Sequence, residues 1–476
     1  MRIVVINGSP KGNYSVTLQT VLFLQKKFND DIFEIINVGQ QIKKFEKDFK
    51  SAQEAINNAE LILFSYPVYT FLAPCQLHRF IELLKENNLN VKGKLVAQIT
   101  TSKHFYDMTA HQFIKDNCAD LGLLYVEGLS QDMDDLLTQK GQNDAIKFWE
   151  YVRFCAKNKI FSNCQTNKNI ISNMAQEIEN DNICHPKNDV DKNSDVKDND
   201  VIEDNLTPNN NVSNKQNKDI VIVTDCKDND KKLSKMIEDF QKTAPFNTRV
   251  VNIRNYKFDG GCLGCFKCAQ DGKCVYKDGF DSFLRQKIQC ADGIIYAFSI
   301  SDHSMGSCFK MYDDRQFCNG HRQVTVGMPV GYLICGNLLQ EENLRCVIAG
   351  RIEVGHTFLA GIVTDQEDTS LQMAQLVLKM EYALNNKMLL PQNFYGVGGT
   401  KIFRDLIYVM RGLMKADHKF YKANGIYDFP QKQRATILKM QFVGFLMSKP
   451  TIAKKMGNKM NEEIVKPYKK VIENIK

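Results

Sequence analysis

The feature of this sequence that most constrains its fold is an alternation of short apolar runs with helical patterns, which occurs twice along the chain. In the first half, the apolar runs lie at 2–7, 32–38, 60–67, 94–101 and 123–128. The helical patterns lie near 15–28, 51–58, 74–86, 108–121 and 140–157. Runs that are apolar throughout are typical of strands buried on both faces, so this half predicts a parallel sheet covered by helices.

The same alternation restarts in the second half. Its apolar runs lie at 219–225, 248–253, 291–300, 329–336 and 356–364. Its helical patterns lie near 230–242, 279–288, 303–318, 340–351 and 369–386. Five strands alternating with five helices favour the flavodoxin-like strand order 2-1-3-4-5. We therefore predict an α/β fold of two tandem flavodoxin-like, doubly wound, parallel five-stranded sheets that repeat one unit, followed by a helical C-terminal extension.

Composition divides the chain into four segments. Between the two alternations, residues 165–218 are dominated by asparagine and aspartate, contain no aromatic residue and show no periodicity. Such a segment buries too little apolar area to offset its chain entropy, which indicates a disordered linker. The predicted domains are therefore 1–164 and 219–390, with a mostly helical extension at 391–476.

Length and composition predict a globular protein of two domains and an appendage, with 476 residues, 43% hydrophobic and 25% charged. The first apolar run is too short for the core of a signal peptide, and no run of about eighteen apolar residues occurs. The fifteen cysteines show no disulfide pattern. In a reducing compartment, clustered cysteines usually serve metal or redox chemistry, and we expect a cytoplasmic protein.

Positive charge is concentrated at the C-terminus. From Lys387 to Lys476 there are 18 Lys and Arg against 6 Asp and Glu, an excess larger than the net charge of +7 of the whole chain. The preceding residues are therefore mildly acidic, and no recognition module appears, which disfavours nucleic acid as a partner. The cationic segments 398–422 and 433–450 fit packing on the protein or on a second subunit better than membrane contact. The glycine-rich run 396–399 follows no predicted strand and is a weak candidate for a nucleotide site.

The loop between the first strand and the first helix, INGSPKGNYSVT at 6–17, has the composition of an anion-binding site. Ligands bind at the carboxyl ends of strands in such sheets, and the N-terminus of the following helix favours negative charge. The loop supplies neutral donors and one cation, namely Ser9, Lys11, Asn13, Ser15 and Thr17. Because the P-loop and dinucleotide patterns are absent, a terminal phosphomonoester fits better than a nucleoside triphosphate. A plain turn with a helix cap is the alternative.

Two further loops fall at the same edge of the predicted sheet, one after the third strand and one after the fourth. Pro67 and Tyr69 lie in the first of these loops, and Phe105 and Tyr106 lie in the second. The first pair is suited to wall a planar ring, and Phe105 or Tyr106 would close the other side.

These loops resemble those of the NADPH-dependent FMN reductases and iron–sulfur flavoproteins of the flavodoxin-like superfamily. The family has a Gly-Ser-Pro-(Arg/Lys) first loop ending in Ser/Asn-x-Thr, and a Pro-x-Tyr loop followed by a helix of the PAQLKAFIDR kind. This chain has GSPKGNYSVT and PVYTFLAPCQLHRFIELL. The resemblance implies that the FMN phosphate is held by Ser9, Lys11, Asn13, Ser15 and Thr17. It also implies that the FMN ring contacts Pro67, Val68, Tyr69, Thr101, Ser102 and Lys103. It covers both α/β units but only loosely the extension.

Four cysteines lie close together in the second half, in GGCLGCFKCAQDGKC at 260–274, and they are Cys262, Cys265, Cys268 and Cys274. The spacing C-x2-C-x2-C-x5-C allows three sulfurs to surround an iron–sulfur cube while the fourth completes the shell. A zinc site usually draws on two separated pairs of ligands. The segment resembles that of iron–sulfur flavoproteins, which implies a [4Fe–4S] cluster, with zinc or no metal as alternatives. The other cysteines, such as Cys290 and Cys335, are expected to be packing residues.

Each half lacks what the other carries. At the position of the anion loop, the second half reads TDCKDNDKKLSKM, and Asp225, Asp228 and Asp230 stand where a phosphate dianion would lie. Like charges oppose phosphate binding there. Conversely, the first half has no thiol at 38–55, the counterpart of the cysteine segment. We therefore predict FMN on the first unit and the cluster on the second.

No side chain is assigned a catalytic role, because hydride transfer to FMN needs no protein acid or base. His104 and His111 lie near the proposed ring loop, where surface or capping roles are expected. Asp313, Asp314 and Arg315 end the helix that matches the family's FIDR segment, and we expect them to form ion pairs or unit–unit contacts.

Together these features predict a flavin oxidoreductase that takes electrons from NAD(P)H and passes them through FMN and a [4Fe–4S] cluster to a small-molecule or protein acceptor. The alternatives are a non-enzymatic, flavodoxin-like electron carrier and a scaffold without cofactors. A homo-oligomer is compatible with the sequence.

Overall fold

The computed structural model describes residues 1–158, 160–161, 216–366 and 368–451. The predicted linker lies outside the described residues, except for its last three, which begin strand β6. Met1–His418 form one compact unit that contains both sheets, and Lys419–Lys476 form a second unit.

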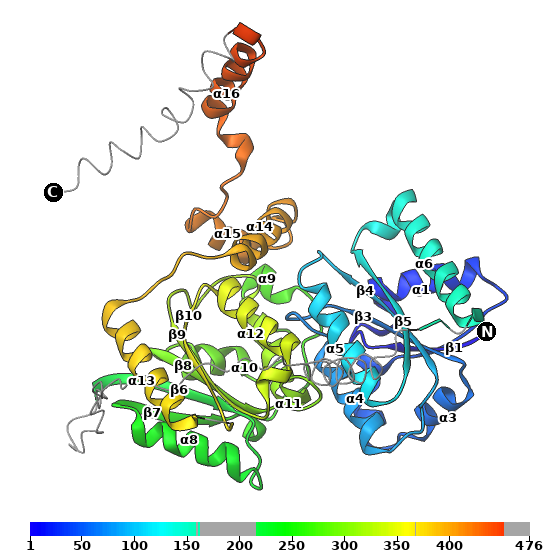
Figure 1. Ribbon diagram of the computed structural model, residues 1–476, viewed down its shortest axis with the longest axis horizontal. Helices are drawn as coiled ribbons and strands as arrows, with labels where there is room; N and C mark the ends of the chain where they lie inside the picture. Colours follow the sequence, from blue (N-terminus) through cyan, green and yellow to red (C-terminus); the bar gives the residue numbers. More distant parts are fainter. Residues whose placement is uncertain (159, 162–215, 367, 452–476) are drawn as a thin grey trace, which may run out of the picture. The chain divides into compact units, whose positions relative to one another are not determined.

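The first α/β repeat is a parallel sheet in the order β2-β1-β3-β4-β5 (Figure 1). Its strands are β1 (Arg2–Asn7), β2 (Ile32–Ile36), β3 (Leu61–Pro67), β4 (Leu95–Ser102) and β5 (Leu124–Asp132). Its helices are α1 (Val16–Lys27), α2 (Val38–Phe45), α3 (Lys50–Asn58), α4 (Cys75–Glu86), α5 (Asp107–Asp120) and α6 (Gln139–Asn158). The predicted strand order is confirmed, and α2 is a helix that the sequence patterns did not indicate.

The second α/β repeat has the same topology, because its order β10-β9-β8-β6-β7 reads 2-1-3-4-5 from the opposite edge. Its strands are β6 (Gln216–Thr224), β7 (Phe246–Asn252), β8 (Gly293–Ser299), β9 (Pro329–Cys335) and β10 (Phe358–Thr364). Its helices are α8 (Lys231–Thr243), α9 (Lys267–Asp271), α10 (Phe280–Phe283), α11 (Gly306–Arg315), α12 (Glu342–Gly355) and α13 (Thr369–Asn386). A π-helical turn, Leu284–Ile288, continues α10.

Both faces of each sheet are buried, which explains the continuous apolar runs. Along β1, Val4 faces a core shared by the two repeats, whereas Val5 faces a core made only of the first repeat. Along β6, Val221 joins the shared core, whereas Ile222 faces a core made only of the second repeat. The two repeats therefore share one continuous apolar core and do not pack as separate domains.

Helices α4 and α11 pack against each other across the boundary between the repeats. The same strained turn precedes each helix. Thr70 and Phe71 have φ angles of 41° and 71°, and Asp302 and His303 have φ angles of 52° and 60°. In both turns an antiparallel bridge closes the loop around these residues. Two non-glycine residues in the left-handed region are unusual, so their recurrence at equivalent positions supports the internal duplication.

The two helices cap each other in a reciprocal way. The backbone N–H of Cys75, the first residue of α4, donates to Asp314 Oδ2 at 2.8 Å. The backbone N–H of Ser307, in the first turn of α11, donates to Glu82 Oε1 at 2.7 Å. Each carboxylate thus satisfies an orphan N–H at a helix N-terminus of the other repeat. Such an exchange is expected of two copies of one unit docked about a pseudo-twofold axis.

The C-terminal extension contains α14 (Phe394–Val409), α15 (Lys415–Ala423) and α16 (Arg434–Met447), which confirms its helical character. Helix α14 packs against α12. Within the described part of the chain, no helix is long and apolar enough to cross a membrane.

Candidate functional site

The loop after β1 forms a single 3-10 turn, Gly12–Tyr14, before α1 begins. Ser15 is the N-cap of α1, and its hydroxyl accepts a hydrogen bond from the N–H of Leu18 at 3.4 Å. Ser9 is fully buried, and its hydroxyl accepts a hydrogen bond from the N–H of Lys11 at 3.3 Å. The loop therefore holds neutral hydroxyls and a helix N-terminus together at the carboxyl end of β1, where an anion is favoured.

Hydroxyl groups connect this loop to the loop after β4. The hydroxyl oxygens of Thr17 and Thr101 are 2.7 Å apart, and both residues are buried. The hydroxyl of Ser102 is also buried and has no hydrogen-bond partner among the described residues. A buried hydroxyl without a partner is costly, so Ser102 fits a polar ligand atom at this point. The side chain of Asn13 is exposed, and its amide oxygen accepts a hydrogen bond from Asn37 at 3.0 Å.

The loop after β3 begins at Pro67, the last residue of the strand. The N–H of Val68 donates to the carbonyl of Thr101 at 3.2 Å, which joins the two loops predicted to contact a flavin ring. Tyr69 follows, and Lys310 of the second repeat donates to its carbonyl at 2.9 Å. The structure therefore brings the predicted ring residues of the two loops together, and the second repeat fixes their position.

Three other predicted residues have protein partners of their own. Lys103 donates to Asp132 at 2.6 Å. Phe105 and Tyr106 pack against Phe71, with ring centroids 5.0 Å and 4.2 Å from it. These side chains shape the end of the loop after β4 and join it to the turn that precedes α4.

Helix α14 of the extension contacts this aromatic cluster. The ring centroids of Phe403 and Phe105 are 4.6 Å apart. A Cβ placed on Gly399 would lie 2.8 Å from the Phe105 ring and 2.9 Å from Val354 of α12. Gly399 therefore allows α14 to approach both repeats closely, and the glycine-rich run at 396–399 belongs to a packed helix.

The cysteine-bearing loop, residues 259–278, reaches from the second repeat to the first. Its Gly264 lies against Tyr69, and a Cβ placed there would be 1.9 Å from the tyrosine hydroxyl. Its Phe266 ring lies under Lys11, with Nζ 5.5 Å from the ring centroid. Lys43 of α2 donates to the carbonyl of Asp259 at 2.8 Å. The cysteine loop thus contacts two loops of the first repeat. One is the loop after β1 (8–15), the anion loop or phosphate-type loop, and the other is the loop after β3 (68–74), the ring-type loop.

The four cysteines of this loop are free thiols with different environments. Cys265 is exposed, and Cys262, Cys268 and Cys274 are half-buried. Cys262 accepts a hydrogen bond from the N–H of Gly264 at 3.4 Å, the kind of contact that tunes sulfur ligands of iron–sulfur clusters. Burial raises the pKa of Cys268 to about 11. The donor set suits a cluster, but no group of three or more His, Cys, Asp or Glu within the described ranges is arranged to hold a metal ion.

Arg315, the last residue of α11, holds the base of the cysteine loop. Its guanidinium donates to both carboxylate oxygens of Asp278 at 2.8 Å and to the carbonyl of Gly260 at 2.7 Å. It also lies over the ring of Tyr276, 4.6 Å from the centroid. The prediction that Arg315 forms ion pairs is confirmed, and its role is to position the loop.

Asp314 forms both an ion pair and a contact between the repeats, as predicted. It pairs with Lys310, and the side chains of both are completely buried. It also accepts hydrogen bonds from the N–H of Cys75 at 2.8 Å and the hydroxyl of Thr70 at 2.5 Å. Burial raises the pKa of Asp314, while the adjacent Lys310 acts in the opposite direction.

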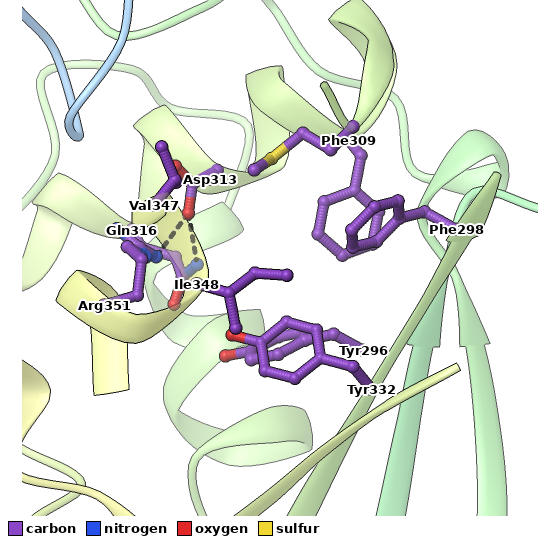
Figure 2. A pocket seen from close by; sticks show the side chains of 10 residues that line it. Tyr296, Phe298, Phe309, Asp313, Gln316, Tyr332, Val347, Ile348 and Arg351 are labelled. Atoms are coloured by element: carbon purple, nitrogen blue, oxygen red, sulfur yellow. Dashed lines mark hydrogen bonds and ion pairs between the residues drawn. The ribbon is translucent and has the colours of Figure 1, made fainter. Parts of the chain in front are cut away.

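Asp313 points into a pocket of the second repeat between β8, β9, α11 and α12 (Figure 2). There it pairs with Arg351 and accepts a hydrogen bond from Gln316 at 3.4 Å. The rings of Tyr296 and Tyr332 line the same pocket. The prediction of an ion pair at Asp313 is confirmed.

The second repeat has acidic side chains where the first has its anion loop. Asp230 is the N-cap of α8 and accepts a hydrogen bond from the N–H of Leu233 at 3.1 Å. It therefore occupies the position that Ser15 has in the first repeat. Burial raises the pKa of Asp225 to about 6, and Arg254 opposes this shift. A phosphate dianion would meet a carboxylate at this cap, and like charges oppose phosphate binding there.

His104 and His111, the two histidines near the loop after β4, differ in their exposure to solvent. His104 is exposed and contacts Asp107 at 2.9 Å, as expected of a surface residue. His111 is largely buried, with Nε2 2.7 Å from the hydroxyl of Thr100. Burial lowers the pKa of His111 to about 4, so it is neutral near pH 7.

Comparison with known proteins identifies the first repeat. Residues 1–128 match the model of the NADPH-dependent FMN reductase family. They form an NADPH-dependent FMN reductase domain. This domain contains the anion loop after β1 and the loops after β3 and β4 that are predicted to contact the flavin ring. Its match supports a flavin oxidoreductase of NAD(P)H-dependent type. No curated protein sequence matches the chain significantly.

Several solved structures are similar to the chain at low sequence identity. RosB is 11% identical, with coverage of 44% of this chain and 98% of its own, at a TM-score of 0.27. An NAD(P)H:quinone oxidoreductase from Methanothermobacter marburgensis is 10% identical, with coverage of 34% and 97%, at a TM-score of 0.27. The flavoenzyme FerB from Paracoccus denitrificans is 16% identical, with coverage of 32% and 97%, at a TM-score of 0.26.

Proposed function

We propose that the chain is an NAD(P)H-dependent flavin oxidoreductase with FMN on the reductase domain and a [4Fe–4S] cluster on the cysteine loop of the second repeat. Its electrons would pass to a small-molecule or protein acceptor. The observation that carries the proposal is the contact between the cysteine loop and the ring-type loop, where Gly264 lies against Tyr69. Two redox groups bound at these loops would be neighbours within one chain.

The residues of the reductase domain suit FMN. The N-terminus of α1 and the hydroxyls of Ser9 and Ser15 would receive the phosphate, with Lys11 as the nearby cation. Thr17, at the start of α1, would fix the anion loop to the end of β4 through its contact with Thr101. The backbone at Pro67 and Val68, the side chain of Tyr69 and the unpartnered hydroxyl of Ser102 would contact the ring.

FMN, when bound, supplies the exchange between a two-electron hydride donor and acceptors that take electrons singly. The protein's own part is to bind and orient. Asp314 and Lys310 hold the ring-type loop from the second repeat, and the aromatic cluster at Phe105 packs its neighbour loop. The Nε2 of His111 is engaged with the hydroxyl of Thr100, so His111 is assigned to positioning the end of β4.

Anaerobic purification of the full chain tests the cofactor content. We expect one FMN, four iron ions and four sulfide ions per chain. Zinc in place of iron would overturn the cluster, and a colourless protein would overturn the whole proposal. Steady oxidation of NADH or NADPH with an added acceptor is expected of the enzyme, whereas an electron carrier would show none.

A charge substitution at one helix cap tests the FMN site specifically. Asp230 shows that aspartate caps the equivalent helix, so Ser15→Asp is expected to keep α1 capped. Its carboxylate would repel the phosphate, and we expect FMN binding to be lost while the thermal midpoint stays within a few degrees of wild type. Ser15→Asn is the matched control, because asparagine is an equally good cap without charge and should retain FMN. Normal FMN content in Ser15→Asp would place the flavin elsewhere.

A further inference from the structure

The cysteine loop is rigidly supported at its base by the second repeat. Arg315 binds the carbonyl of Gly260 at 2.7 Å and the carboxylate of Asp278 at 2.8 Å. The hydroxyl of Tyr276 donates to the carbonyl of Gly261 at 3.1 Å. These three contacts fix the direction in which the tip of the loop projects.

The tip fits closely against the first repeat. Gly261 lies over the start of α4, where an added Cβ would be 2.3 Å from Cys75 Sγ and 2.7 Å from the amide nitrogen of Gln76. Gly264 lies against Tyr69, where an added Cβ would be 1.9 Å from the hydroxyl. Only a residue without a side chain allows contact at such distances. The two glycines therefore seat the loop on the residues that precede and begin α4.

The far side of the loop reaches the phosphate-type loop. The ring of Phe266 lies under the Lys11 ammonium, at 5.5 Å from its centroid. Lys43 of α2 donates to the carbonyl of Asp259 at 2.8 Å. A cation over an aromatic face is attracted to the ring quadrupole, so Phe266 helps to set where Lys11 lies. One loop of the second repeat thus touches residues proposed for both ends of the flavin, Lys11 and Tyr69.

We propose that the cysteine loop is a wall of the FMN site, so that the flavin site of the reductase domain is completed by the second repeat. Gly264 and Phe266 are positioning residues in this wall, since they act on Tyr69 and Lys11. The proposal rests on FMN binding to the reductase domain as described above. It adds that flavin affinity depends on how the cysteine loop is seated, whatever the loop itself binds.

FMN titration of the full chain, followed by quenching of flavin fluorescence, tests the proposal with two matched glycine variants. Gly264 and Gly272 lie in the same loop with φ angles of 59° and 78°, so alanine costs a similar backbone strain at both. A Cβ at Gly272 would meet only the flexible end of Arg322, at 3.2 Å. We expect Gly264→Ala to raise the Kd for FMN at least tenfold and Gly272→Ala to raise it less than threefold.

A double-mutant comparison separates contact with Tyr69 from general damage to the loop. In a Tyr69→Leu background the hydroxyl and the ring carbon Cζ, which the new Cβ would meet at 1.9 Å and 2.8 Å, are both absent. The Kd increase caused by Gly264→Ala is therefore expected to fall below threefold, relative to Tyr69→Leu alone. A purely structural effect on the loop would be the same in both backgrounds. Phe266→Ala, which is expected to raise the Kd about threefold, replaces Gly264→Ala if that variant does not fold.

The outcomes distinguish this inference from the proposed function. A wild-type chain that binds no FMN overturns both. A wild-type chain that binds FMN, with Gly264→Ala or Phe266→Ala binding equally well or more tightly, overturns only the wall, because the loop would then be a bystander or a competitor of the flavin.

Discussion

Replacing Asp314 with alanine is expected to destabilise the docked repeats far more than the equivalent replacement of Glu82. Both carboxylates cap a helix of the other repeat, so the two variants lose a similar capping contact. Removing such a cap costs about 1 kcal/mol. The difference lies in what remains, because Asp314 is also the partner of Lys310, and both of these side chains are 0% exposed.

The magnitude follows from the charge left behind. Breaking a buried ion pair from one side costs about 3–5 kcal/mol, because the other charge stays buried without compensation. Asp314→Ala would leave the Lys310 ammonium with the carbonyl of Tyr69, the hydroxyl of Thr70 and the Asp313 carboxylate 4.0 Å away, which is already paired with Arg351. The side chain of Glu82 is 17% exposed and also contacts Arg79, so Glu82→Ala leaves no isolated charge in the core. We expect the two free energies of unfolding to differ by about 2–4 kcal/mol.

Equilibrium urea denaturation of the full chain, followed by circular dichroism, measures this difference if the slopes of the variants agree. A third variant, Lys310→Met with Asp314→Leu, removes both charges and is expected to recover about 2 kcal/mol of the loss. Equal destabilisation by Asp314→Ala and Glu82→Ala would refute the reasoning, because it would mean that water or local rearrangement relieves the Lys310 charge.

Two further predictions concern pH and the cysteines. Hydrogen bonding to Asp120, assisted by Glu341, raises the pKa of His303 to about 9, so its stabilising contact between the repeats is complete below pH 6.5 and is lost as the pH rises through about 9. The urea midpoint is expected to fall over this window, by the equivalent of about 1–3 kcal/mol, and a flat profile identical to that of His303→Gln would contradict the assignment. Cys268→Ser is expected to lower the iron content of anaerobically purified protein at least fivefold. Cys290 is exposed, so the expectation that it is a packing residue is wrong, and Cys290→Ser, outside the loop, should leave the iron content unchanged. Equal iron in both variants would remove Cys268 from the ligand set.

The fold was predictable from the sequence because each strand is buried on both faces. That burial demands continuous apolar runs such as 2–7, and such runs are visible without any knowledge of tertiary contacts. Helix α2 escaped prediction although Val38, Ile42 and Phe45 have the i, i+4, i+7 spacing of an amphipathic helix, because its eight residues are shorter than the stretch over which that periodicity is recognised. The anion loop was recognisable for the same local reason, since its turn and its helix cap at Ser15 lie within a few residues of each other.

The parts of the site that involve two repeats were not predictable in detail. Nothing local to Gly264 indicates that a tyrosine from another repeat lies against it, and nothing local to Asp314 indicates that it caps α4. A signal did exist in the equivalence of the two turns before α4 and α11, but the residues there are unrelated, with Thr70 matching Asp302 and Phe71 matching His303. The shared left-handed backbone and the antiparallel bridge that closes each turn reveal that equivalence.

Joining two copies in one chain removes a constraint that a symmetric dimer would impose. In a twofold dimer both subunits use the same surface patch, so a buried cation such as Lys310 would appear twice in the interface. Here its counterpart in α4, by the alignment of the two turns, is His78, which stacks on Phe113 at 3.9 Å and is kept neutral because burial lowers its pKa. The same freedom allows the equivalent helix caps of the two repeats to differ, with the neutral Ser15 in one, which would tolerate an anion, and the acidic Asp230 in the other, which would repel it. The chain places its cysteine loop against the first repeat, at Lys11 and Tyr69, on the edge whose helix cap is the neutral Ser15.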